Sequence, residues 1–382
     1  MSFDSLDSSR TQRTWTLTAR LLLALHLDGA LFTGLCLLAA IGLVIVFSAS
    51  GGSSAMLQAQ GFKLVLASVV LLMLAQVPVR LIRASAPWLY LIGLLLLLVV
   101  AAKGDVAMGA RRWLDLGFIR FQPSEIMKIA MPLACAWYLH ERPLPPTLMN
   151  IIVLLAAIAV PTALIAKQPD LGTALLVVAS GGMVILLAGL RVRYIVAVVS
   201  LVIIGITVGT LLDWNFLHGY QRQRVLTLLD PSSDPLGSGY HIIQSQIAIG
   251  SGGAFGKGYM NGTQAQLEFL PERSTDFIFA VIGEEWGLFG LTTVLFLYGF
   301  VIARGLFLAA TAQDTFARLV TGSLSLTFAV YVLINTGMVT GLLPVVGVPL
   351  PLISYGGTSM VTLMAGFGIL MAVNARRRLV GR

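Results

Sequence analysis

The chain has 382 residues, of which 57% are apolar and 11% are charged, and its mean hydropathy is +0.89. A soluble domain is typically about 45–50% apolar and about 25% charged. This chain therefore has too little polar surface to fold as a soluble globule. The composition excludes a cytosolic enzyme, a secreted disulfide scaffold and a disordered regulator, and leaves a polytopic membrane protein.

Ten apolar segments follow the polar first 30 residues, and each can cross a bilayer as a helix, which takes about 20 residues. They are 31–50, 61–77, 86–102, 124–139, 149–166, 171–190, 194–212, 287–305, 317–335 and 358–374. Residues 1–30 show no small-residue cleavage site, so they are predicted to be retained. An even number of spans places both termini on the same side.

The distribution of charge decides that side. One set of loops, together with both chain ends, holds 14 basic and five acidic residues, and the other holds 11 basic and 12 acidic residues. Because Lys and Arg accumulate on the cytoplasmic side, both termini are predicted to be cytoplasmic. The net charge of +8 is thereby explained by topology, and no nucleic-acid partner is expected. The predicted domains are a cytoplasmic extension (1–30), a ten-span membrane domain (31–375) and a basic cytoplasmic tail (376–382).

Two predicted outer segments are long, 103–123 and 213–286. The second lies between spans 7 and 8, and structureless loops of its length are uncommon, so we expect short helices and turns there. The predicted fold class is an all-α polytopic membrane protein with about ten transmembrane helices and one large extracytoplasmic loop.

Ionisable residues at membrane depth cost about 2.5–3.5 kcal/mol on insertion scales, so they mark candidate sites. The first group is Arg111, Arg112 and Trp113, followed by Glu125 and Lys128. Glu125 and Lys128 can simply neutralise each other as an i,i+3 pair. Alternatively, Lys128 and the two arginines form a cationic site for an anionic lipid headgroup.

The second place concerns two helix starts that are predicted at the outer ends of spans. Ser124, after Pro123, is expected to be the N-cap of the fourth span, and Asp170 that of the sixth. For Asp170, a functional role at the mouth of a cavity stays equally open.

The third group is the segment 270–286, which holds Thr275, Asp276 and Glu284. Because the next span can begin at residue 287, residues 276–286 are predicted to be a short outer helix or a protein-shielded start of the span. On a helix, Asp276 and Glu284 share a face and would line one side of a cavity. A solvated acidic loop end is the alternative.

The fourth place is 341–357, where three prolines and four glycines exclude a regular span. Irregular backbone at this depth is tolerated only against protein or a water-filled cavity. Ser354 and the amides of Gly356 and Gly357 can donate to an anion there, or the segment is a structural re-entrant turn. The glycine-rich stretch 250–258 lacks the residues of a phosphate-binding loop, so it is predicted to be a flexible surface turn, and no nucleotide cofactor is expected.

Four motifs, in the same order, resemble the SEDS family of bacterial cell-wall polymerases. They are QPSEIMK at 122–128, QPDLGT at 168–173, LPERSTDFIFAVIGEE at 270–285 and GLLPVVGVPLPLISYGG at 341–357. The similarity covers the chain from about residue 31 onwards. The stretch NGTQAQ at 261–266 and the last motif are more similar to the RodA branch of the elongation machinery than to the division branch FtsW.

The resemblance implies a peptidoglycan glycosyltransferase in the bacterial cytoplasmic (inner) membrane that polymerises lipid II during cell elongation and rod-shape maintenance. Lipid II is the undecaprenyl-pyrophosphate-linked disaccharide pentapeptide. The resemblance implies that Asp276 is the essential acid. It also implies a class B penicillin-binding protein of the elongation complex as the partner that supplies the transpeptidase, besides contacts with the nascent glycan and membrane lipids.

In this chemistry the acceptor 4-hydroxyl attacks the anomeric carbon of the donor, and Asp276 is predicted to take the proton. Lys128, Arg111 and Arg112 are predicted to face the leaving pyrophosphate. The other predicted substrate contacts are Glu125, Trp113, Asp170, Thr275, Glu284 and Ser354. A divalent cation, Mg²⁺ or Mn²⁺, fits this reaction, and its candidate ligands are Asp276, Glu125 and Asp170.

Two alternatives come from other functional classes. A lipid II flippase predicts charged residues through the whole depth of the bundle, whereas here they concentrate at the outer end. A non-catalytic scaffold of the cell-wall machinery does not need carboxylates and cations that converge at the outer helix ends. The sequence therefore favours chemistry at the outer face.

Overall fold

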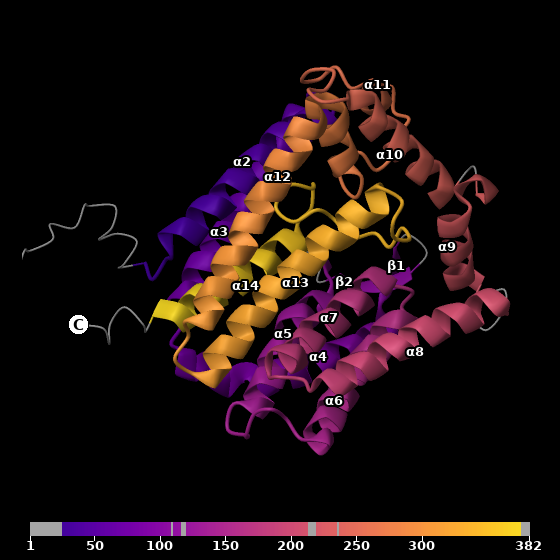
Figure 1. Cartoon of the computed structure of the whole chain (residues 1–382). Helices are drawn as coiled ribbons and strands as arrows, with labels where there is room; N and C mark the ends of the chain where they lie inside the picture. Colours follow the sequence, from indigo (N-terminus) through magenta and orange to yellow (C-terminus); the bar gives the residue numbers. More distant parts are fainter. Residues whose placement is uncertain (1–24, 108–109, 116–119, 213–218, 235–236, 376–382) are drawn as a thin grey trace, which may run out of the picture.

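The structure, a computed structural model, describes residues 25–107, 110–115, 120–212, 219–234 and 237–375. This part of the chain is mainly helical (Figure 1). Most of the predicted N-terminal extension and the whole basic tail lie outside the described residues, so the domain boundaries at the two ends stay predictions.

Each of the ten predicted spans coincides with a helix. They are α2 (Gly29–Ala49), α3 (Ser54–Ala75), α4 (Val79–Lys103), α5 (Pro123–Leu139), α6 (Leu148–Lys167), α7 (Leu171–Leu187), α8 (Val192–Leu211), α12 (Ile278–Ala310), α13 (Thr315–Val339) and α14 (Thr358–Ala375). In the described residues, α2, α3, α4, α6, α12 and α13 are long and apolar enough to cross a membrane, and α7 and α14 are shorter apolar helices. The chain is a multi-pass membrane protein, and the count of ten spans stays a prediction.

The two ends of the helical bundle differ. The first turn of α2 and the last turn of α14 lie at the same end (Figure 1), as an even number of spans requires. At this end Asp28 caps α2 and accepts two hydrogen bonds from Arg304 of α12, at 2.9 and 2.8 Å. That this end is cytoplasmic stays a prediction from the charge distribution.

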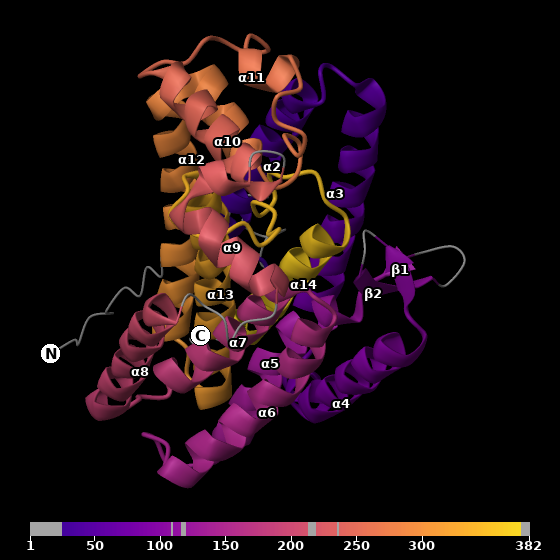
Figure 2. The ribbon, with the colours of Figure 1, turned by 90° about the vertical axis from the view of Figure 1, so that its right-hand side faces the viewer.

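The long outer segments fold locally. Residues between α4 and α5 form an antiparallel sheet of β1 (Asp105–Ala107), β2 (Ala110–Asp115) and β3 (Arg120–Phe121), in that order (Figure 2). The segment before α12 contains α9 (Gly219–Leu229), the 3₁₀ turn η1 (Pro231–Ser233), α10 (Ser238–Gly252) and α11 (Thr263–Gln266). The expectation of short helices and turns in the large loop is confirmed.

Helix α12 breaks at Gly287, which has φ 62° and ψ −158°. All residues from 278 to 285 are buried, so the predicted protein-shielded start of the span is confirmed. A Cβ at residue 287 would lie 2.4 Å from the backbone nitrogen of Gly256, so only glycine fits. The backbone N–H groups of residues 257 and 258 donate to the carbonyls of 284 and 285. The glycine-rich stretch 250–258 therefore packs on the break in α12.

Residues 341–357 run between the helices without regular structure, at the centre of the bundle in Figures 1 and 2. Two glycines on flanking spans admit this backbone. A Cβ at Gly42 of α2 would lie 2.5 Å from the carbonyl oxygen of Leu352, and one at Gly172 of α7 would lie 2.6 Å from that of Val346. The predicted irregular segment (the re-entrant segment, 341–357) is therefore present; Val348 and residues 350–354 are buried by protein, whereas Leu342 and Leu343 are exposed.

The contact at Gly42 gives a stability prediction. Gly42→Ala is expected to destabilise the protein by about 1–3 kcal/mol, because the new methyl group must displace backbone. Gly61→Ala on α3 is the matched control, since a Cβ there meets no atom within 4 Å and only gains helix propensity. Thermal unfolding in detergent should show a lower midpoint for Gly42→Ala alone. Equal midpoints for the two variants would refute the close approach.

Candidate active site

The segment that precedes α12 is held at three consecutive carbonyl oxygens, those of residues 274–276. The first accepts a hydrogen bond from the backbone N–H of Tyr355 at 2.8 Å. The second accepts one from the hydroxyl of Ser354 at 2.6 Å, and the third from the side-chain amide of Asn335 at 2.8 Å. The re-entrant segment and α13 thus determine the backbone position of Asp276.

Asn335 and Ser354, together with Gln60, also hold the re-entrant segment itself. Asn335 donates to the carbonyl of Val348 at 2.8 Å, and the hydroxyl of Ser354 accepts from the N–H of Leu350 at 2.8 Å. Gln60 of α3 donates to the carbonyl of Ser354 at 3.1 Å and accepts from the N–H of Gly356 at 3.4 Å. The prediction that Ser354 donates to an anion is corrected, because the hydroxyl is buried and donates its hydrogen bond to the carbonyl of Thr275.

The carboxylate of Asp276 lies in a partly buried position. Burial, together with the smaller effect of the negative charge of Glu272, raises the pKa of Asp276 to about 6. Gly347 of the re-entrant segment has φ +71°, and a Cβ there would lie 3.4 Å from Oδ2 of Asp276. The hydroxyl of Thr275 donates to the Glu272 carboxylate at 2.5 Å. These contacts give a carboxylate that is ionised near neutral pH and more basic than an ordinary aspartate.

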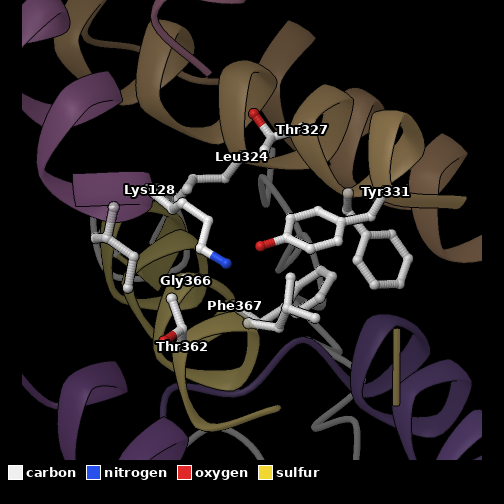
Figure 3. Close-up of a pocket in the computed structure, with 10 residues that line it drawn as sticks. Lys128, Leu324, Thr327, Tyr331, Thr362, Gly366 and Phe367 are labelled. Atoms are coloured by element: carbon white, nitrogen blue, oxygen red, sulfur yellow. The ribbon is translucent and has the colours of Figure 1, made fainter. Parts of the chain in front are cut away.

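Helix α5 carries the second part of the site. The ammonium of Lys128 lies 2.6 Å from the Glu125 carboxylate, and both side chains are buried. The predicted i,i+3 pair is therefore confirmed. The ammonium lies 5.2 Å from the centroid of the Tyr331 ring, and Figure 3 shows it pointing toward the Tyr331 hydroxyl. Lys128 also lines a small cavity of about 30 Å³ between α5, α13 and α14, whose other walls are mostly apolar.

The start of α5 differs from the prediction. Gln122, not Ser124, occupies the N-cap position, and Pro123 is the first helical residue, which suits its missing N–H. The hydroxyl of Ser124 is buried and has no hydrogen-bond partner among the described residues.

Strand β2 brings Arg112 to the turn between α6 and α7. The guanidinium of Arg112 donates to the carbonyl of Gln168 at 3.1 Å and to that of Pro169 at 2.5 Å. Arg111 and Trp113 lie in the same strand; Trp113 is partly buried, and the side chain of Arg111 lies outside the described part. Arg112 therefore stabilises the turn, and its predicted contact with the leaving group stays a hypothesis.

Asp170 caps α7, as predicted. One carboxylate oxygen accepts from the N–H of Thr173 at 3.2 Å, and the other accepts from the side-chain amide of Gln122 at 2.8 Å. Asp170 thus caps the first turn of α7 with one oxygen and holds the start of α5 with the other. The capping interpretation accounts for the position of Asp170.

Glu284 has a structural role that its sequence position did not reveal. Its fully buried carboxylate accepts from the ammonium of Lys257 at 2.7 Å, from the Thr263 hydroxyl at 3.0 Å and from two backbone N–H groups of α11, at 2.9 and 3.2 Å. The prediction that Glu284 and Asp276 share a helix face is wrong, because the helix begins two residues after Asp276. Glu284 anchors α11, so it does not line the substrate site.

The candidate metal ligands do not come together. Within the described residues, no three His, Cys, Asp or Glu side chains are grouped so that they can hold a metal ion. Glu125 is paired with Lys128, and both oxygens of Asp170 are hydrogen-bonded. The described residues therefore do not fit a resident Mg²⁺ or Mn²⁺ ion with these ligands.

Two residues that contact the re-entrant segment were missed by sequence reasoning. Asn335 stands at the end of a predicted span, where an amide gives no distinctive signal. Lys63 lies within the predicted second span, and its ammonium is 3.6 Å from the centroid of the Tyr355 ring. A lone lysine in an apolar span was the available signal, because intramembrane charges mark functional sites.

Comparisons with known proteins agree with this arrangement. The family model described as "Cell cycle protein", which covers FtsW, RodA and SpoVE, matches residues 29–379. The chain is 51% identical over 358 residues to the peptidoglycan glycosyltransferase MrdB of Escherichia coli (strain K12), covering 94% of this chain and 96% of that protein.

Two solved structures are similar over 92% of this chain. One belongs to a study of how a peptidoglycan synthase complex coordinates polymerization and crosslinking; its matching chain is 33% identical, is covered to 98% and gives a TM-score of 0.80. The other is the rod shape determining protein RodA of Thermus thermophilus, which is 29% identical, is covered to 97% and gives a TM-score of 0.69. The chain therefore belongs to the FtsW/RodA/SpoVE family, the SEDS family that its four motifs resemble.

Proposed function

We propose that the protein is a peptidoglycan glycosyltransferase that polymerises lipid II into glycan strands at the outer face of the bacterial cytoplasmic membrane, during cell elongation and rod-shape maintenance. The observation that carries this proposal is the position of Asp276, a carboxylate of raised pKa on a backbone anchored at three consecutive carbonyls. The 51% identity to a named peptidoglycan glycosyltransferase supports it.

The proposed reaction assigns Asp276 the role of general base. The acceptor 4-hydroxyl attacks the anomeric carbon of the donor, the bond to undecaprenyl pyrophosphate breaks, and the hydroxyl proton passes to the carboxylate. A base with a pKa of about 6 is largely ionised at neutral pH and is still basic enough to accept a proton in the transition state. The anchored backbone keeps the carboxylate in place while the sugars move past it.

The leaving pyrophosphate needs cations nearby. Lys128, whose ammonium donates to Glu125 and faces the Tyr331 hydroxyl, is the proposed contact on α5 for an anionic oxygen. Arg111 and Trp113 stay proposed substrate contacts at the outer end of the bundle. A divalent cation, if the reaction uses one, requires ligands beyond those predicted.

A class B penicillin-binding protein is the proposed partner. The similar chain in a peptidoglycan synthase complex supports an assembly that combines polymerisation with crosslinking. Large apolar side chains stand exposed on the outer segment, including Phe255 (85% exposed) and Leu267 (64%). Such exposed apolar groups are typical of protein interfaces.

The first test removes the proposed base. Asp276→Asn is expected to lower lipid II polymerisation about 10²–10⁴-fold, the usual contribution of general base catalysis. Polymerisation is measured with the purified protein, with and without the transpeptidase and with and without chelator. Asp314→Asn is the matched control, since this carboxylate is exposed beside Arg83 at the opposite end of the bundle. Near wild-type polymerisation by Asp276→Asn would refute the assignment. If the wild-type protein together with the transpeptidase makes no product, a flippase or a scaffold is favoured instead.

The second test uses pH. Protonation inactivates a base, so activity is expected to fall as the pH drops through about 6, the pKa of Asp276. Glu272→Gln removes a nearby negative charge, and this removal favours the ionised form of Asp276. The pH below which activity falls should therefore be lower in this variant. Glu141→Gln, an exposed carboxylate beside His140, serves as the control. If the pH at which activity falls is unchanged or higher in Glu272→Gln, the assignment is contradicted.

A further inference from the structure

Helix α3 carries a lysine well inside its apolar length. Lys63 is nine residues beyond Ser54, so it lies about 13 Å along the helix from that end at 1.5 Å per residue. The end of α2, just before the turn that leads to Ser54, adjoins the outer segment, because Gln266 of α11 donates to the carbonyl of Ser48 at 3.2 Å. Lys63 therefore lies below the outer end of α3, within the second predicted span (61–77).

The charge of Lys63 is poorly compensated. The ammonium lies over the face of the Tyr355 ring, 3.6 Å from its centroid, and no ion pair among the described residues includes it. Lys128, in contrast, has the Glu125 carboxylate at 2.6 Å. A cation–π contact offsets only part of the cost of desolvating an ammonium. The side chain is partly exposed, so its charge is available to an anion.

Lys63 lies beside the turn that positions the active-site segment. Gln60, one helical turn earlier, is hydrogen-bonded to both sides of Tyr355, through the carbonyl of Ser354 and the N–H of Gly356. The N–H of Tyr355 in turn donates to the carbonyl of Ser274. A Cβ at residue 356 would meet no atom within 4 Å, so there is open space next to this turn. An anion held by Lys63 would therefore lie close to the Asp276 segment.

We propose that Lys63 binds a phosphate oxygen of a polyprenyl-linked pyrophosphate, at a subsite separate from that of Lys128. The inference rests on the proposed function, in which donor and acceptor each carry a lipid-linked pyrophosphate. The two cations come from different helices, α3 and α5, and contact different tyrosines, Tyr355 and Tyr331. One cation is thus available for each lipid-linked substrate.

The test measures the affinity of undecaprenyl pyrophosphate for the purified protein in nanodiscs of uncharged phosphatidylcholine. Lys63→Gln is expected to weaken binding about tenfold or more, as loss of a charge-assisted hydrogen bond does. Lys63→Arg, which keeps the charge, should restore most of the affinity. Lys103→Gln is the matched control, because this exposed lysine ends α4. Unchanged affinity in Lys63→Gln would overturn the proposal.

A second probe separates charge recognition from a structural role. Undecaprenol has the same chain without phosphate, so its affinity should not change in Lys63→Gln. A loss of affinity for both probes, with a lower unfolding midpoint, would mean that Lys63 only stabilises the turn at Tyr355, and would overturn the proposal. Competition by phosphatidylglycerol or by inorganic pyrophosphate as strong as that by undecaprenyl pyrophosphate would also overturn it. Because binding needs no turnover, these outcomes are independent of whether the protein polymerises lipid II.

Discussion

Hydrogen bonds to three consecutive carbonyl oxygens, at residues 274–276, are the constraint on which the proposed site depends. Their donors belong to α13 and to the re-entrant segment, which has no regular structure of its own. Such a segment can exist at membrane depth only if protein surrounds it and supplies hydrogen-bond partners. Gly42 of α2 and Gly172 of α7 make that enclosure possible, because a Cβ at either position would clash with a carbonyl oxygen of the segment.

The charged groups of the bundle fall into two classes. Lys128 with Glu125, and Lys257 with Glu284, neutralise each other at 2.6 and 2.7 Å. Such pairs tolerate burial because each charge has a partner. Asp276 and Lys63 differ, because neither has an oppositely charged partner among the ion pairs of the described residues. We infer that the second class interacts with the charges of the substrate directly, whereas Lys128 would share its ammonium between Glu125 and an anionic oxygen of the substrate.

Features set by local sequence were predictable. Long apolar runs predicted the helices, an acidic residue after proline predicted the cap of α7, and the i,i+3 spacing predicted the pair on α5. Features set by distant contacts were not. Ser354 reaches a carbonyl 79 residues away and Glu284 anchors α11, and neither partner follows from helical periodicity. Functional and structural uses of a buried polar side chain look identical until its partners are known.

The central claim is that these anchors hold the carboxylate of Asp276 in its reacting position. The most direct measurement is kcat and KM for lipid II polymerisation by Asn335→Leu, which keeps the side-chain size and removes two hydrogen bonds. If the anchors position the base, kcat should fall about tenfold or more at nearly unchanged KM, because small misplacements of reacting groups are costly. A folded Asn335→Leu protein with wild-type kcat would contradict the claim.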